Sequence, residues 1–150
     1  MKYKFLNIIG LMTGTSMDGI DVSLVQTNGF ELKRLNKNYF YEYNIDTKKQ
    51  LMDILKEDIA CNLKRKQYLD EFVTNEHYLA LKDLDIVESS DLIGFHGQTI
   101  YHDPKNKISI QLGDPKLLAK MLKKNVISDF RLNDLASGGQ GAPLAPVYHK

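Results

Sequence analysis

The sequence lacks several features that define whole classes of protein. Its single cysteine, Cys61, cannot form an internal disulfide, which excludes a disulfide scaffold and favours a reducing, cytoplasmic setting. No apolar run reaches the roughly 18 residues that a membrane-spanning helix requires. The first residues run directly into a polar, glycine-containing stretch without a signal-type cleavage region, so they predict a strand rather than an export signal. For Cys61 we expect a small buried side chain on a helix.

The charge of the chain is almost balanced. Its 20 basic and 19 acidic residues give a formal net charge of +1, which provides no electrostatic reason to expect a nucleic acid or an anionic membrane as partner. With 150 residues, 43% of them hydrophobic and 26% charged, the chain has the composition of one soluble globular domain. No internal repeat is visible.

Hydrophobic periodicity predicts an α/β protein. Strands are expected at 4–12, 20–27, 30–44, 91–98, 107–114 and 125–130, and helices at about 47–59, 69–80 and 115–124. Short turns join the first three strands, so these are expected to be antiparallel. Two helix starts have capping signals, which are Thr47 with Gln50, and Asp114 with Pro115. The stretch 131–150 reads as a glycine-rich loop that leads into a further helix at Pro146.

The stretch GLMTGTSMDGIDVSLV, residues 10–25, carries glycines, hydroxyls and acids between two apolar runs. Its glycines permit a tight turn, and its amides and hydroxyls can converge on an anion. Asp18 and Asp21 could hold Mg²⁺ together with phosphates. An ordinary hairpin turn, in which polar side chains satisfy their own backbone, explains the same residues. The stretch matches neither a Walker loop nor a dinucleotide fingerprint.

Two later segments place polar groups at the ends of predicted strands, where ligands bind in open sheets. FHGQTIYHDP contributes His96, Gln98, Thr99 and His102, and we take His102 to be an ordinary loop histidine. The spacing of the histidines argues against a zinc site. SDFRLND contributes Asp129, Arg131 and Asp134, whose carboxylates could bind a metal, hold a sugar hydroxyl or act as a base. Local pairing of Asp129 with Arg131, which would only order the glycine loop, is the alternative.

The glycine loop itself follows these residues. Gly138, Gly139 and Gly141 are too many for a helix and indicate backbone close to a ligand, or a hinge. Gln140 lies among them as a polar donor.

Taken in order, GLMTGTSMDGIDVSLV, GFHGQTIYHDP, SIQLGD and VISDFRLNDLASGGQGAPLAPVYH resemble the anhydro-N-acetylmuramic acid kinases, bacterial sugar kinases of the actin, hexokinase and heat-shock ATPase superfamily. The resemblance covers nearly the whole chain and is weakest at about 40–90. It implies a ribonuclease-H-like (actin-like ATPase) fold, with a mixed sheet, flanking helices and a cleft between two such domains. It also implies ATP, Mg²⁺ and 1,6-anhydro-N-acetylmuramic acid as ligands, and peptidoglycan recycling as the process.

The resemblance assigns site residues by position. Gly14, Thr15, Ser16, Met17, Asp18, Gly19, Ile20 and Asp21 match the ATP-binding loop, with Asp18 a candidate Mg²⁺ ligand. His96, Gln98 and Thr99 match a segment near the sugar, and Asp129, Arg131 and the Gly138–Pro143 loop with Gln140 match a segment that lines the cleft.

The sequence departs from the family at its end. The general base of the family is expected in an Asp-x-Gly-Pro motif, which this sequence lacks. That base is therefore expected beyond Lys150, and Asp129 is the best acid within the chain. We expect an amino-terminal fragment, incomplete at the C-terminus and without its second domain, which is inactive alone. Its expected partners are the sugar and either a complementing C-terminal half or a second copy. The alternatives are a non-catalytic remnant and a different actin-like sugar or acetate kinase, against which HGQT and GGQGAP argue.

Overall fold

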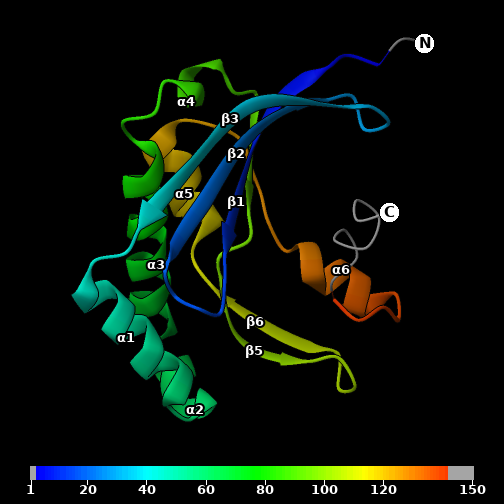
Figure 1. The fold of residues 1–150 in the computed structure, drawn as a ribbon. Coiled ribbons are helices and arrows are strands. Elements are labelled where there is room, and N and C mark those ends of the chain that lie inside the picture. Colours follow the sequence, from blue (N-terminus) through cyan, green and yellow to red (C-terminus); the bar gives the residue numbers. More distant parts are fainter. Residues whose placement is uncertain (1–2, 142–150) are drawn as a thin grey trace.

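The computed structural model describes residues 3–141, which build a five-stranded sheet beside a separate hairpin (Figure 1). The strand order of the sheet is β3-β2-β1-β4-β7. Its strands are β1 (Leu6–Thr13), β2 (Gly19–Thr27), β3 (Leu32–Glu42), β4 (Leu92–Phe95) and β7 (Val126–Ile127). β1, β2 and β3 pair antiparallel as the sequence predicts, whereas β4 runs parallel to both β1 and β7. The hairpin consists of β5 (Gln98–Asp103) and β6 (Ile108–Leu112).

Helices flank the sheet unequally. The chain forms α1 (Ile45–Lys56), α2 (Ile59–Lys64), α3 (Lys66–Leu81), α4 (Ile86–Ser89), α5 (Pro115–Leu122) and α6 (Phe130–Ala136). Figure 1 shows α3 and α5 together on one side of the sheet, with α6 on the opposite side. None of the helices in the described part of the chain is long and apolar enough to cross a membrane.

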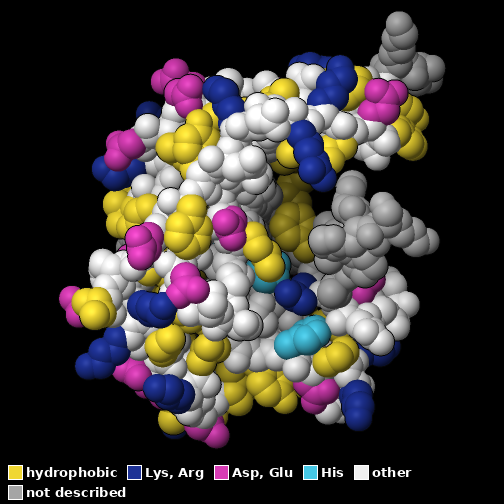
Figure 2. All heavy atoms as spheres, in the orientation of Figure 1, with side chains coloured by type: hydrophobic (Ala, Val, Ile, Leu, Met, Phe, Trp, Pro, Cys, Tyr) yellow, Lys and Arg dark blue, Asp and Glu magenta, His cyan; other side chains and the backbone are white. Residues whose placement is uncertain are grey.

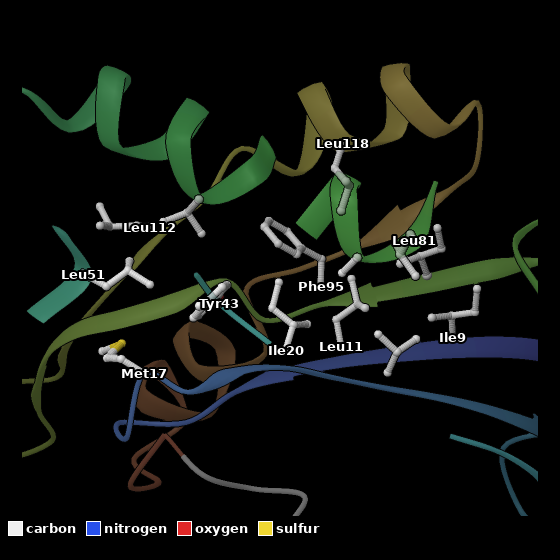
Figure 3. Close-up of a cluster of buried hydrophobic side chains, with 14 of the residues drawn as sticks. Ile9, Leu11, Met17, Ile20, Tyr43, Leu51, Leu81, Phe95, Leu112 and Leu118 are labelled. Atoms are coloured by element: carbon white, nitrogen blue, oxygen red, sulfur yellow. The ribbon is translucent and has the colours of Figure 1, made fainter. Parts of the chain in front are cut away.

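The main core lies between α3, α5 and one face of the sheet, here called the inner face. Alternate residues of the central strands point into it, including Ile9, Leu11, Ile20 and Phe95, which are at most 5% exposed. Figure 3 shows these side chains meeting Leu81 and Leu118 from the helices. Burying a side chain of this size contributes about 1.5–3 kcal/mol. The alternation that predicted the strands thus also fixes which face is covered.

Two helix starts differ from the sequence prediction and one agrees with it. The N-cap of α1 is Asn44, whose side chain accepts a 2.9 Å hydrogen bond from the amide of Thr47. The capping box predicted at Thr47 is therefore wrong, and Thr47 is buried in the first turn. Ile59, which was assigned to the same helix, instead begins α2 behind the N-cap Asp58. Asp114 caps α5 ahead of Pro115 as predicted.

Cys61 lies on a helix as predicted, but its side chain is exposed. The buried residue of α2 is the neighbouring Asn62, whose amide donates a 2.7 Å hydrogen bond to the carbonyl of Ile54. The buried side chain of Asn62 thus attaches α2 to α1, and Cys61 faces away from the core.

Two strand boundaries were also wrong. The strand predicted at 91–98 ends at Phe95, because Gly97 turns the chain with φ +68° and Gln98 begins the unpredicted strand β5. The strand predicted at 125–130 is only β7, because Asp129 adopts φ +62° and starts α6. The seven residues of α6, which the sequence analysis assigned to the end of a strand and to a loop, are therefore helical. Gly138–Gly141 follow α6, whereas residues 142–150, including Pro143 and the helix predicted at Pro146, lie outside the described range.

Candidate functional site

Three parallel strands end at the same edge of the sheet, and each is followed by a predicted site segment. Gly14–Asp18 follow β1, His96–Gln98 follow β4, and Ser128–Arg131 follow β7. The buried hydroxyl of Thr13 donates a 2.9 Å hydrogen bond to the carbonyl of Gly97, which ties the first two segments together. Ligands of open α/β sheets bind beyond the carboxyl ends of such strands.

The loop after β1 has an exposed and an anchored half. Gly14, Thr15 and Ser16 are exposed, so their amides and hydroxyls are accessible to a ligand. Met17 adopts φ +54° and is only 1% exposed, so it anchors the loop in the core. The left-handed backbone at Met17 directs the chain into β2.

The second half of the loop is built mainly for packing. A Cβ atom at Gly19 would lie 2.1 Å from the carbonyl oxygen of Tyr41, so glycine is required by the close approach of β3. Ile20 is fully buried, and Asp21 lies within β2 opposite Phe40. The loop therefore offers Gly14–Ser16 and Asp18 to a ligand, while Gly19 and Ile20 shape the fold.

Asp18 is the one loop carboxylate with a cationic partner. It pairs with Lys48 of α1, and its backbone carbonyl accepts a 2.9 Å hydrogen bond from the amide of Tyr43. The hydrogen bond from Lys48, with another from Ser16, lowers the pKa of this exposed carboxyl. Asp18 is therefore ionised at neutral pH and held at the mouth of the loop.

His96 is fixed as a neutral imidazole. Its Nε2 accepts a 2.8 Å hydrogen bond from Nε of Arg131, so its Nδ1 carries the proton that it donates to the carbonyl of Gly97 at 2.8 Å. Burial lowers the pKa of His96, and the nearby charge of Arg131 lowers it further. With both ring nitrogens engaged, His96 positions its neighbours and is not set up as a general base.

Arg131 also orders the glycine turn, which consists of residues 138–141 after α6. Its Nη1 donates a 2.9 Å hydrogen bond to the carbonyl of Gly141, and Asp134 accepts a 2.7 Å hydrogen bond from the amide of the same residue. Arg131 and Asp134 therefore order the turn. Asp129, which the sequence analysis considered for this pairing, is exposed and accepts a 3.3 Å hydrogen bond from the hydroxyl of Ser128.

Gln98 and Thr99 lie at the start of β5. Gln98 is 2% exposed, and its amide nitrogen donates a 3.2 Å hydrogen bond to the carbonyl of Thr99. Its side-chain oxygen has no hydrogen-bond partner among the described residues. The hydroxyl of Thr99 accepts a 3.4 Å hydrogen bond from Gln111 on β6.

A cleft of about 590 Å³ opens between β6, the start of α5 and the start of α6. His96, Asp129 and Arg131 line it. Figure 2 shows histidine and basic side chains close together in the hollow of the face that it draws. The Gly14–Asp21 loop, Gln98, Thr99 and Gln140 do not line it. The predicted sugar residues are thus only partly brought together, and the predicted phosphate loop lies outside this cleft.

The cleft also contains residues that were not singled out from the sequence, notably Gln111, Asp70 and Lys66. Asp70 accepts a 3.0 Å hydrogen bond from the amide of Gly113 and pairs with Lys66. Gln111 could have been selected from the sequence, because it lies in the SIQLGD motif that carries part of the family resemblance. Asp70 is 43 residues from Gly113, and no local pattern predicts that contact.

The strand order, the three antiparallel strands and the convergence of the loops at one sheet edge define an actin-like ATPase domain. The chain belongs to the anhydro-N-acetylmuramic acid kinase family, whose model matches residues 6–150. It is 39% identical to the anhydro-N-acetylmuramic acid kinase of Pelagibacter ubique over 97% of this chain and 41% of that protein. The corresponding protein of Nitrobacter winogradskyi is 36% identical over 97% of this chain and 42% of its own length. The chain thus spans about two fifths of these relatives.

Proposed function

We propose that residues 1–150 form the amino-terminal domain of a two-domain, ATP-dependent kinase that phosphorylates 1,6-anhydro-N-acetylmuramic acid. The family match over residues 6–150 carries this proposal. The convergence of three candidate site segments at one sheet edge supports it. We expect the activity in the cytoplasm, where ATP is available, as part of peptidoglycan recycling.

The proposed reaction joins a hydrolysis to a phosphoryl transfer. Water adds to C1 of the sugar while the bond from C1 to the bridging O6 breaks, and O6 takes the γ-phosphoryl group of ATP. The products are ADP, N-acetylmuramic acid 6-phosphate and a proton that derives from the water. Positioning and charge stabilisation supply most of the catalysis in such transfers.

Each segment has a role that its geometry suits. The exposed amides and hydroxyls of Gly14–Ser16 are suited to hold the ATP phosphates. The cleft beside His96 and Arg131 is suited to a polar, hydroxylated ligand such as a sugar, because the two side chains are held rigidly by hydrogen bonds. We expect the base that activates water outside this chain.

Mg²⁺, which stabilises the charge on the transferred phosphoryl group, fits one residue of the loop. Mg²⁺ in kinases is held by one or two carboxylates together with phosphate oxygens and water. The exposed, ionised carboxylate of Asp18 provides one such ligand, and Lys48 would have to release it. No group of three metal-binding side chains occurs among residues 3–141, which agrees with a metal carried largely by the nucleotide.

The second candidate function is a non-catalytic half that binds phosphate or sugar weakly. The separation of the Gly14–Asp21 loop from the residues that line the cleft favours it. Such a half needs a complementing chain or a second copy to bring its ligands together.

An activity assay separates these functions. The chain is incubated with ATP, Mg²⁺ and the anhydro sugar, alone and after co-expression with the part of the Pelagibacter ubique relative that lies outside the match, and the sugar phosphate is followed by ³¹P NMR. We expect product only from the combined chains. Product from the chain alone would refute the requirement for a second half, and no product in either sample would refute the kinase proposal.

Asp18→Asn tests the loop in the combined chains. We expect at least a hundredfold loss of product formation with unchanged folding, because the metal ligand is lost. Lys48→Met keeps the carboxylate but removes its partner, so it should remain active. Asp85→Asn, which removes a comparable surface partner of a lysine, serves as the matched control. Full activity of Asp18→Asn would leave the loop as an ordinary turn.

A further inference from the structure

Two side chains of α3 bind consecutive backbone amides at the end of the β5–β6 hairpin. Asp70 accepts a 3.0 Å hydrogen bond from the amide of Gly113. One turn further along α3, the hydroxyl of Thr74 accepts a 2.7 Å hydrogen bond from the amide of Asp114 and donates one of 2.7 Å to the carbonyl of Asp70. Residues four positions apart lie on the same face of a helix, so both side chains meet the same turn. We call Asp70 and Thr74 the α3 clamp.

The clamped turn is also confined from the side of the sheet. Gly113 adopts φ +124°, and a Cβ atom there would lie 2.4 Å from the ring of Phe95. A Cβ atom at Gly97 would lie 2.2 Å from the carbonyl oxygen of Leu112, which is itself fully buried (Figure 3). The end of β6 therefore lies directly against the end of β4 and the turn that follows it, which contains His96.

The clamp borders the cleft described above. Asp70 lines this cleft together with the end of β6 and the turn, here called the cleft wall and defined as residues 109–114. Within the wall, the side-chain amide of Gln111 donates a 2.6 Å hydrogen bond to the hydroxyl of Ser109. Asp114 continues into α5 as its N-cap. The clamp thus fixes the wall at the point where β6 passes into α5.

Ion pairing alone does not explain Asp70. Lys66 pairs with it from one turn earlier on α3, but such pairs on a helix surface contribute little to stability. The side chain of Asp70 is only 18% exposed, and a carboxylate shielded from water needs hydrogen bonds such as the one from Gly113. Thr74 is fully buried, and its hydroxyl satisfies a backbone amide that has left the sheet. Two acceptors aimed at one turn hold that turn in a single position.

We propose that Asp70 and Thr74 are positioning residues, which hold the Gly113–Asp114 turn so that the cleft wall keeps the shape in which it receives a ligand. They act on the ligand through the wall, whose backbone they bind. The identification of this ligand as the anhydro sugar rests on the proposed function, whereas the placement of the turn does not.

Hydrogen exchange of the whole chain, followed by NMR without ATP or sugar, tests the placement of the turn. Asp70→Leu and Thr74→Val each remove one acceptor, whereas Asp70→Asn and Thr74→Ser each retain it. Glu71→Leu removes an exposed carboxylate beside the clamp on α3 and is the matched control. The amide of Ile93, which donates a 2.9 Å hydrogen bond to the carbonyl of Asn125, provides the reference for unfolding of the whole domain.

We expect the two acceptor-removing variants to lower the protection of the Gly113 and Asp114 amides, relative to that of Ile93, at least about tenfold. The conservative variants and the control should keep the native ratio. An unchanged ratio would overturn the inference, as would an equal loss of protection at Ile93, which would show a contribution to overall stability only. If Thr74→Val does not fold, Asp70→Leu decides the result, because the side chain of Asp70 reaches the surface.

The combined chains provide a kinetic test of the same residues. Asp70→Leu should raise the KM for the anhydro sugar at least about fivefold and leave the KM for ATP unchanged, since it alters the cleft wall and not the Gly14–Asp18 loop. Asp70→Asn should restore the native value. An unchanged KM for the sugar, or an equal rise in both KM values, would overturn the inference. If the native combined chains form no product, the kinase proposal fails and hydrogen exchange alone decides this inference.

Discussion

His77 makes the stability of the fold depend on pH. This residue of α3 is 1% exposed, and its ring packs edge-on against Phe95 with the centroids 4.8 Å apart. Its Nδ1 donates a 2.8 Å hydrogen bond to the carbonyl of Val73, and its Nε2 has no partner among the described residues. Burial lowers the pKa of His77 to about 4.

The sign and size of the effect follow from this pKa. The folded state resists protonation of His77, whereas the unfolded chain takes up the proton near pH 6.5. Stability is therefore complete above pH 6.5 and is lost as the pH falls toward about 4, below which the loss levels off. A difference of two to three pKa units corresponds to a loss of about 3 kcal/mol.

The assay is urea unfolding of the native chain and of His77→Leu at several pH values between 7 and 4. We expect the native free energy of unfolding to fall by about 3 kcal/mol relative to the variant over this range. Comparison with the variant removes the opposite contribution of Glu76, because burial raises the pKa of that carboxyl and favours the folded state at low pH.

His102→Gln removes an exposed imidazole and is the control, which should retain the native pH dependence. Equal pH dependence of the native chain and His77→Leu would refute the assignment of this effect to His77.

Three further predictions about stability are tested by thermal and urea unfolding. Gly19→Ala should destabilise the fold by about 1–3 kcal/mol because its Cβ would collide with the carbonyl of Tyr41, whereas Gly10→Ala should change stability little; equal effects would contradict this reading. Leu118→Ala should cost about 2–5 kcal/mol, since the side chain is fully buried, and a loss below 1 kcal/mol would show that the α5 interface is loose. Asp114→Ala should cost about 1 kcal/mol through loss of the N-cap, while Asp114→Asn should retain most of the stability.

The sequence correctly predicted those features of the fold that depend on residues close together in the chain. The alternation in β2 identified its buried face, and Asp114 with Pro115 identified the start of α5, because both signals arise within a few residues. The cap of α1 was misplaced by three residues, since Asn44 and Thr47 both suit the position and only the backbone decides between them. The end of β7 and the turn at Asp129 could not be predicted either, because nothing in the sequence indicates that this non-glycine residue adopts φ +62°.

The site depended on contacts that a linear sequence does not reveal. Arg131 donates a hydrogen bond to His96, 35 positions away, so the local pairing with Asp129 that was considered as an alternative does not form. From the sequence, Gly19 was explained by a tight turn, but a Cβ atom at this position would collide with the carbonyl of Tyr41 on the adjacent strand, which already requires a glycine there. The sequence thus indicated which residues are important more reliably than it indicated what each of them does.

A chain of hydrogen bonds gives the separated segments a common frame. The carbonyl of Gly97 accepts from the hydroxyl of Thr13 and from Nδ1 of His96, which uses both of its lone pairs. His96 then accepts from Arg131, and Arg131 donates to the carbonyl of Gly141. The end of β1, where the Gly14–Asp18 loop begins, is therefore joined through neutral His96 to the glycine turn beyond α6. Protonation of His96 would place a proton against the guanidinium of Arg131 and break this connection, so burial of His96 preserves the arrangement of the site as well as its charge state.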